Sequence, residues 1–166
     1  MRPVQFECQT IIPAPAEVIC TQIADVTRWR EFQGAGFLPG IASAEYKRRT
    51  ANMVGSRIRV KNTDGSHHME EFTVWENGRK IVTKLHDFSP PLNRLATHFL
   101  EEWNFETQGN ATHVRRTLSL FPKQAVTRPA LWLISRFLRQ AITRQLRQMT
   151  QEAEAVAHVA QAGRKI

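Results

Sequence analysis

The chain is poor in cysteine and contains no long apolar run. Its 166 residues include two cysteines, Cys8 and Cys20, and neither belongs to a CxxC motif. We therefore expect a reduced, cytoplasmic protein in which both thiols are small buried hydrophobic groups. No window reaches 18 uninterrupted apolar residues, and the first ten residues lack the basic start and apolar stretch of a signal peptide. Neither a membrane-spanning helix nor a secretory signal is predicted.

The motifs of common catalytic and cofactor sites are also missing. The sequence has no G-x-S-x-G, no P-loop, no G-x-G-x-x-G and no H-E-x-x-H. These absences argue against a hydrolase nucleophile, a phosphate cradle, a dinucleotide site and a zinc protease site. His67 and His68 are adjacent, so in a strand they face opposite sides and cannot easily share one ion. We expect neither a metal nor a cofactor.

Basic residues outnumber acidic ones, 23 to 15, which gives a formal net charge of +8. One group alternates with apolar residues at Arg57, Arg59 and Lys61. A second group lies in a C-terminal segment with helical spacing and consists of Arg128, Arg136, Arg139, Arg144 and Arg147. Nucleic acid, an anionic membrane surface or plain solubility would each account for such an excess. We favour a diffuse basic surface, because acidic residues follow the arginines; no nucleic-acid partner is expected, and transient membrane contact stays open.

The first forty residues predict one strand, two short helices and a loop. Residues 4–12 alternate as a strand, which Pro13 ends. Pro15 suits the first turn of a helix with apolar residues at helical spacing. Asp25 is the expected cap of a second short helix. The glycine-rich segment 34–40 is expected to be a loop.

The rest of the chain predicts a run of strands and one long helix. Turn signals separate six strands, placed at 41–49, 54–62, 66–75, 80–88, 97–107 and 111–121. An amphipathic helix follows over residues 129–158. The whole predicts a single domain over 1–160 with a flexible tail at 161–166. A single helix across such a sheet leaves an incomplete core, so the sheet must curl around it and a cavity is expected between them.

Four segments resemble the helix-grip superfamily (SRPBCC), which includes START lipid-transfer domains, birch-pollen-allergen-like proteins, polyketide cyclases and abscisic-acid receptors. The segments are "IPAPAEVICTQIADVTRWREF" (12–32), "VGSRIRV" (54–60), "VWENGRKIV" (74–82) and "FETQGNATHVRRTLSL" (105–120). The resemblance covers nearly the whole chain. It implies an α+β helix-grip fold: a seven-stranded curved antiparallel sheet wrapped around a long C-terminal helix, with two short helices after the first strand.

Turn types set the strand registers and hence the residues that share a face. A two-residue loop at Gly109-Asn110 places Trp103 opposite Arg116. An Asn-Gly turn joins the fourth and fifth strands, and a three-residue loop with a left-handed Gly65 joins the third and fourth. The other expected pairs are Phe99–Leu120, Glu101–Leu118, Phe105–Val114, Val74–Ile81, Phe72–Thr83, Ile58–Glu70 and Val60–His68.

Four polar residues interrupt the inner apolar face: His68, Glu70, Glu101 and Arg116. A buried carboxylate without a partner costs several kcal/mol, so each group needs an explanation. Glu101 and Arg116 lie within pairing reach, and they form a structural pair, contact a polar ligand or lie wet at a strand end. By resemblance, Glu70 matches a glutamate that lines the hormone cavity of abscisic-acid receptors. The gate and latch loops of those receptors are not recognisable here.

Two apolar groups are candidates for the ends of the cavity. Trp29 and Phe32 lie in the second short helix, where they pack in the core or close one end. The segment 88–92 exposes Phe88 and Leu92 as a cover of the mouth or a membrane contact, or else is held by the core.

Three functions fit these expectations. The first, which we favour, is binding or transport of a hydrophobic small molecule such as a lipid, an isoprenoid or a polyketide-like compound. The second is a polyketide cyclase/dehydratase-type enzyme with Glu70 and His68 as acid–base residues. The third is an electrostatic adaptor for anionic membrane or nucleic acid. Enzymatic activity, ligand identity and the choice between monomer and homodimer stay open. The candidate ligand-contacting residues are Trp29, Phe32, Ile58, His68, Glu70, Phe72, Thr83, Glu101, Trp103, Arg116, Leu118, Ile134, Leu138 and Ile142.

Overall fold

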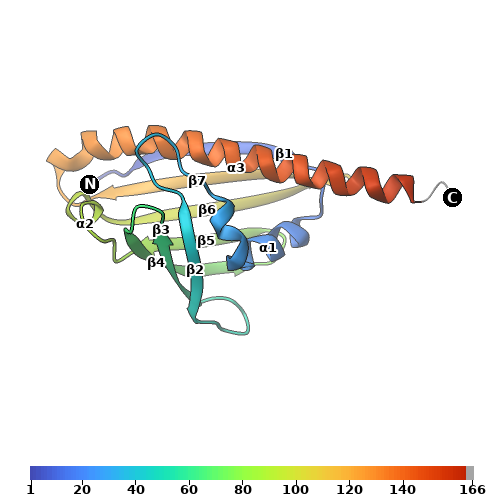
Figure 1. Ribbon diagram of the computed structural model, residues 1–166, viewed down its shortest axis with the longest axis horizontal. Helices are drawn as coiled ribbons and strands as arrows, with labels where there is room; N and C mark the ends of the chain where they lie inside the picture. Colours follow the sequence, from blue (N-terminus) through green and yellow to red (C-terminus); the bar gives the residue numbers. More distant parts are fainter. Residues whose placement is uncertain (164–166) are drawn as a thin grey trace.

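The computed structural model describes residues 1–163 and has the α+β helix-grip architecture, in which a seven-stranded antiparallel sheet holds one long helix against its inner face (Figure 1). Two short helices follow the first strand, as expected. The elements are β1 (Val4–Ile12), α1 (Ala16–Ala24), η1 (Val26–Glu31), β2 (Ile41–Arg48), β3 (Arg57–Asn62), β4 (His67–Glu76), β5 (Lys80–His86), α2 (Leu92–Leu95), β6 (Ala96–Gln108), β7 (Ala111–Pro122), η2 (Ala125–Thr127) and α3 (Arg128–Ala162).

The strand order in the sheet is β1-β7-β6-β5-β4-β3-β2. Strands β2 to β7 therefore form the predicted meander, and β1 returns beside β7. The register inferred from the two-residue loop is confirmed, with Trp103 opposite Arg116. The three-residue loop is confirmed as well, with Gly65 at φ +86°. Six of the seven other predicted pairs are confirmed, namely Phe99–Leu120, Glu101–Leu118, Phe105–Val114, Phe72–Thr83, Ile58–Glu70 and Val60–His68.

The predicted pair Val74–Ile81 is wrong. Val74 pairs with Val82, because the register shifts between Phe72 and Val74. The hairpin turn contains one residue more than the two-residue turn that we assumed, and a bulge compensates for it so that the rest of the register is kept. Trp75 consequently takes the inward position, where its ring centroid lies 4.9 Å from that of Phe72.

Helix α3 is 35 residues long and lies along β1 and β7. Pro129 stands in its first turn, and Leu131, Ile134 and Ile142 are buried on the inner side, as the apolar stripe predicts. The last predicted residue of the apolar stripe is not buried. Val156 is 71% exposed, because the last turns of α3 extend past the sheet (Figure 1). Of the expected tail, residues 161–162 complete the helix, and residues 164–166 lie outside the described residues.

The short N-terminal helices cover the end of the inner face near β2. The Asp25 side chain accepts a hydrogen bond from the Thr27 backbone N–H at 3.1 Å, which is the predicted cap. The capped element η1 is a 3-10 helix, and it packs against β2. Tyr46 of β2 donates its hydroxyl to the Ala24 carbonyl at 2.8 Å, and so ties strand and helix together. No helix within residues 1–163 is long and apolar enough to cross a membrane.

Candidate ligand-binding cavity

A cavity of about 330 Å³ lies between the sheet and α3. This volume is at the lower end of the range of about 300–1,000 Å³ for small-molecule pockets. One wall is formed by β4 to β7 and the opposite wall by α3. Further surface comes from η1, the loop 33–40 and the segment 88–92, and smaller parts from the end of α1 and from the turn between β3 and β4.

The sheet wall is built from rows of residues that face each other across strands. One row runs through Phe72, Thr83, Glu101 and Leu118 on β4, β5, β6 and β7. All four side chains point inward because side chains alternate along each strand and these positions are paired. The row is apolar at both ends and polar in the middle.

The first polar centre is the pair Glu101–Arg116. The Arg116 Nε donates to Glu101 Oε1 at 2.7 Å, and the other guanidinium nitrogens lie against Glu101 and Gln145. Trp103 Nε1 donates to Glu101 Oε2 at 3.1 Å, and its ring lies under the guanidinium at 4.3 Å. Both charged side chains are nearly buried, with 9% and 13% of their surface exposed. A buried ion pair of this kind is tolerated because nearly every polar atom has a partner.

The second polar centre is the pair His68–Glu70 on β4. The His68 Nε2 lies 3.0 Å from Glu70 Oε1, and both side chains face the cavity. The His68 ring also packs beside Phe88, at 5.9 Å between centroids. Within residues 1–163, no group of three His, Cys, Asp or Glu side chains converges as a metal site. An imidazole and a carboxylate in contact can exchange a proton with a bound molecule, or orient it by hydrogen bonds.

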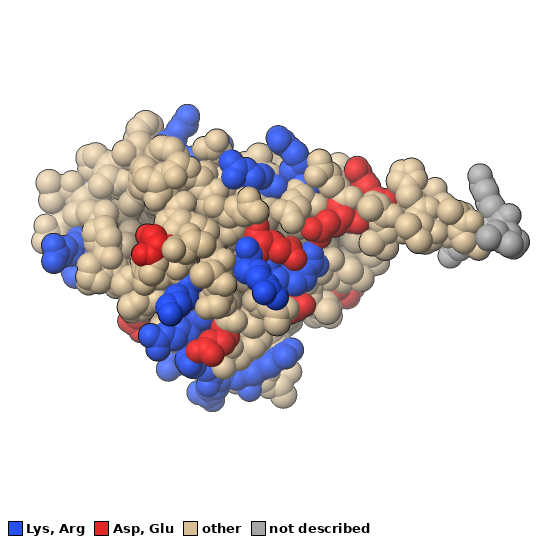
Figure 2. Space-filling model, in the orientation of Figure 1, with Lys and Arg blue, Asp and Glu red and all other residues tan. Residues whose placement is uncertain are grey.

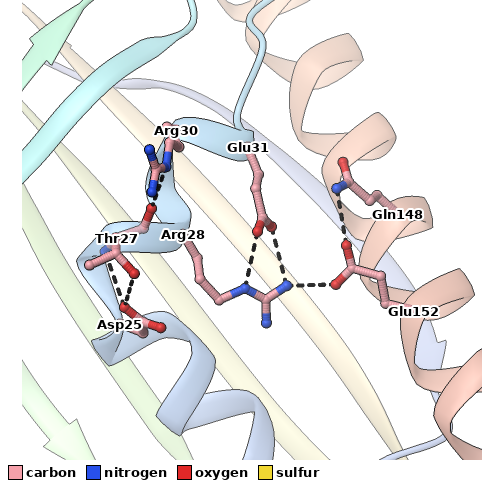
Figure 3. Close-up of polar contacts among 7 residues, drawn as sticks. All are labelled: Asp25, Thr27, Arg28, Arg30, Glu31, Gln148 and Glu152. Carbon is pink, nitrogen blue, oxygen red and sulfur yellow. Dashed lines mark hydrogen bonds and ion pairs between the residues drawn. The ribbon is translucent and has the colours of Figure 1, made fainter.

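A polar bridge joins η1 to α3 at the cavity edge (Figure 3). Arg28 lies between Glu31 of η1 and Glu152 of α3, and its Nη2 is 3.2 Å from a Glu31 oxygen and 2.6 Å from a Glu152 oxygen. Gln148 donates to the other oxygen of Glu152 at 3.1 Å. The hydrogen bond with Glu31 raises the pKa of Arg28 above its ordinary value. Partial burial acts against this shift, and the hydrogen bond with Glu152 adds to it. The bridge therefore stays charged and holds η1 against the helix.

The loop 33–40 and the segment 88–92 line the cavity from the other side. Phe37 is 59% exposed and packs its ring on Phe137 of α3, at 4.7 Å between centroids. Of the alternatives for the segment 88–92, an exposed Phe88 is wrong and a hold by the core is right. Phe88 is buried, and its ring is tilted against that of Phe99 with 4.8 Å between the centroids. Part of the expected loop forms the short helix α2, so the core holds this segment in place.

Thirteen of the fourteen predicted residues line the cavity, and Ile58 does not. Ile58 lies on β3 opposite Tyr46 of β2 and is completely buried in the core. Among the lining residues that were not predicted, Arg28 and Gln145 take part in the polar contacts described above. Gln145 had a signal, since it interrupts the apolar stripe of α3 three residues after Ile142.

The arginines of α3 point away from the cavity, and several contact the protein itself. Arg139 lies over the Phe6 ring at 5.5 Å, and Arg144 donates to the Gly34 carbonyl at 3.2 Å. On the face shown in Figure 2, basic side chains form several separate groups with acidic side chains between them.

The fold and the cavity define a START-like helix-grip protein. Residues 3–154 match the family model described as polyketide cyclase / dehydrase and lipid transport, and the chain belongs to this family. A search of curated proteins finds no match.

Similar folds occur among solved structures. The di-domain ARO/CYC StfQ from the steffimycin biosynthetic pathway is 19% identical with a TM-score of 0.73, covering 95% of this chain and 53% of that one. The Zhui aromatase/cyclase from Streptomyces sp. R1128 is 14% identical with a TM-score of 0.66, covering 92% and 94%. A START superfamily protein from Mycobacterium smegmatis is 17% identical with a TM-score of 0.63, covering 88% and 99%. At these identities the likeness establishes the fold.

Proposed function

We propose that this protein binds and carries a hydrophobic small molecule of the lipid, isoprenoid or polyketide-like class in the cavity between sheet and α3. The observation that carries the proposal is the cavity itself, about 330 Å³ in volume with a mostly apolar wall and a few polar groups. Such a wall favours an apolar ligand by desolvation, and the polar groups orient it.

Extraction of the purified, denatured protein followed by mass spectrometry of small molecules tests this function. A stoichiometric apolar compound, or uptake of an added neutral apolar dye such as Nile red, is the expected result. The variant Leu138→Trp should reduce dye binding at least tenfold, because the larger side chain fills the cavity from α3. The matched control is Leu133→Trp on the outer side of the same helix, where Leu133 is 47% exposed. No uptake by the wild type, or equal loss in both variants, contradicts the proposal.

The pair His68–Glu70 supports a second function. The His68 Nε2 and Glu70 Oε1 atoms lie 3.0 Å apart on the cavity wall. In a cyclase/dehydratase reaction, one group would remove a proton from a carbon between two carbonyls, and that carbon would attack another carbonyl carbon of the same molecule. The new C–C bond forms as the C=O π bond breaks, and the alkoxide takes up the proton to give a hydroxyl. This hydroxyl and a neighbouring proton then leave as water. A linear poly-β-ketone is the substrate to test. Conversion would appear as the loss of one water from the mass of the bound compound, and Glu70→Gln would abolish it. A carrier returns the compound unaltered.

A further inference from the structure

The two polar centres of the cavity differ in what they leave available to a ligand. At the Glu101–Arg116 centre each carboxylate oxygen has a donor, and all three guanidinium nitrogens have an acceptor. The charge of the Arg116 guanidinium is thus already matched by the Glu101 carboxylate, and an incoming anion would have to compete with that carboxylate for it.

The His68–Glu70 centre is open. Only Glu70 Oε1 is engaged, by His68 Nε2, and within the described residues neither Glu70 Oε2 nor His68 Nδ1 has a protein partner. Thr83 stands diagonally across from Glu70 on β5, and its buried side chain lines the same cavity. Glu70 itself is only 7% exposed, so its second oxygen is a poorly hydrated acceptor in the cavity wall. Such an acceptor gains from a donor that a ligand brings in.

The charges of the cavity wall point the same way. Among the described residues that line the cavity, four carry carboxylates, Glu31, Asp64, Glu70 and Glu101, and two are arginines, Arg28 and Arg116. Both arginines are already held by carboxylates. A ligand carboxylate would add a further negative charge beside Glu70, and among residues 1–163 no lysine lines the wall and neither wall arginine is without a carboxylate partner. Like charges repel strongly in a poorly hydrated site.

We propose that the cavity selects apolar ligands whose polar end donates a hydrogen bond and carries no negative charge, a hydroxyl being the simplest case. The hydroxyl donates to Glu70 Oε2 and accepts from Thr83, while the apolar body lies along α3. This inference rests on the proposed binding function and deepens it. It excludes free fatty acids and other carboxylates as preferred ligands.

A matched pair of ligands tests the selection: farnesol and farnesoic acid, which share one apolar chain and differ in the polar end. Their affinities are measured near pH 7.5 by displacement of Nile red. The wild type should bind the alcohol at least tenfold more tightly than the acid. Glu70→Gln keeps the size and an acceptor but removes the charge, and it should reduce this ratio below threefold. The control is Glu71→Gln, the next residue on the same strand, which faces outward and pairs with Arg57 at 3.0 Å; it should keep the wild-type ratio.

Each outcome separates the selection from the binding function. Equal or tighter binding of the acid by the wild type overturns the selection and leaves the carrier function standing. A ratio that persists in Glu70→Gln overturns the role of Glu70. Failure of the wild type to bind Nile red and both ligands overturns the binding function, and the selection with it. Circular dichroism of each variant shows whether the fold is kept, and the wild-type ratio is decisive even if one variant does not fold.

Discussion

Truncation of Arg116 should destabilise the protein far more than truncation of a surface arginine. In Arg116→Leu the carboxylate of Glu101 stays in place, nearly buried, with Trp103 as its remaining donor. Breaking a buried pair by removing one partner costs about 3–5 kcal/mol, because an uncompensated charge is left behind. We expect a loss of that size in the free energy of unfolding, measured by urea denaturation.

A second substitution should then restore stability. Glu101→Gln in the background of Arg116→Leu removes the stranded charge and keeps an acceptor for Trp103, so the double variant should be more stable than the single one by about 2 kcal/mol. The control is Arg57→Leu, which breaks the exposed pair with Glu71 and should cost less than about 1 kcal/mol. If Arg116→Leu costs as little as Arg57→Leu, or if the second substitution destabilises further, the centre is hydrated and the reasoning is refuted.

Two further predictions concern the loop and the outer surface. Gly36→Ala should lower the free energy of unfolding by about 2–4 kcal/mol, because φ is +57° and an added Cβ would overlap the Phe137 ring. Gly109→Ala, at φ +60° with open space around the added Cβ, should lower it by only about 1–2 kcal/mol. Equal losses in urea denaturation would contradict the close packing of the loop on α3. Burial, with nearby positive charge adding to it, lowers the pKa of His98 below its ordinary value of 6.5, so the unfolded state binds more protons than the folded state in the pH range just below 6.5. As the pH is lowered through this range, the melting temperature of the wild type should therefore fall relative to that of His98→Phe. This variant keeps the stack on Phe121. If the two melting temperatures change in parallel with pH, the lowered pKa of His98 is refuted.

The pairing of Glu101 with Arg116 could be predicted because it follows from local rules. A short turn fixes a register, a register fixes which residues face each other, and alternation decides which of them face inward. The same rules failed at Val74 because one additional residue in the turn reverses every facing side chain until a bulge corrects it. An error of one residue in the predicted length of a turn therefore changes the predicted strand pairs next to that turn.

The contributions of Gln145 and Arg28 could not be obtained in this way. Alternation along strands does not determine how far α3 is rotated about its own axis, nor how η1 docks against it. These quantities depend on how many side chains fit together at once, and a pattern of polar and apolar letters does not record shape. The wrong placement of Ile58 at the cavity has the same cause. Its side chain faces inward as predicted, but the sequence pattern did not show that other residues pack over it.

Helix α3 presents one cavity-facing residue in nearly every turn, from Ile134 through Leu138, Ile142 and Gln145 to Met149. At 1.5 Å per residue these positions cover about 22 Å along the cavity. If the proposed ligand lies along α3, a smaller or larger side chain at one turn would admit or block one part of its apolar body and leave β4, which carries Glu70, unchanged. The proposed selection for length and for the polar end would then depend on separate elements, and either could change while the other is kept.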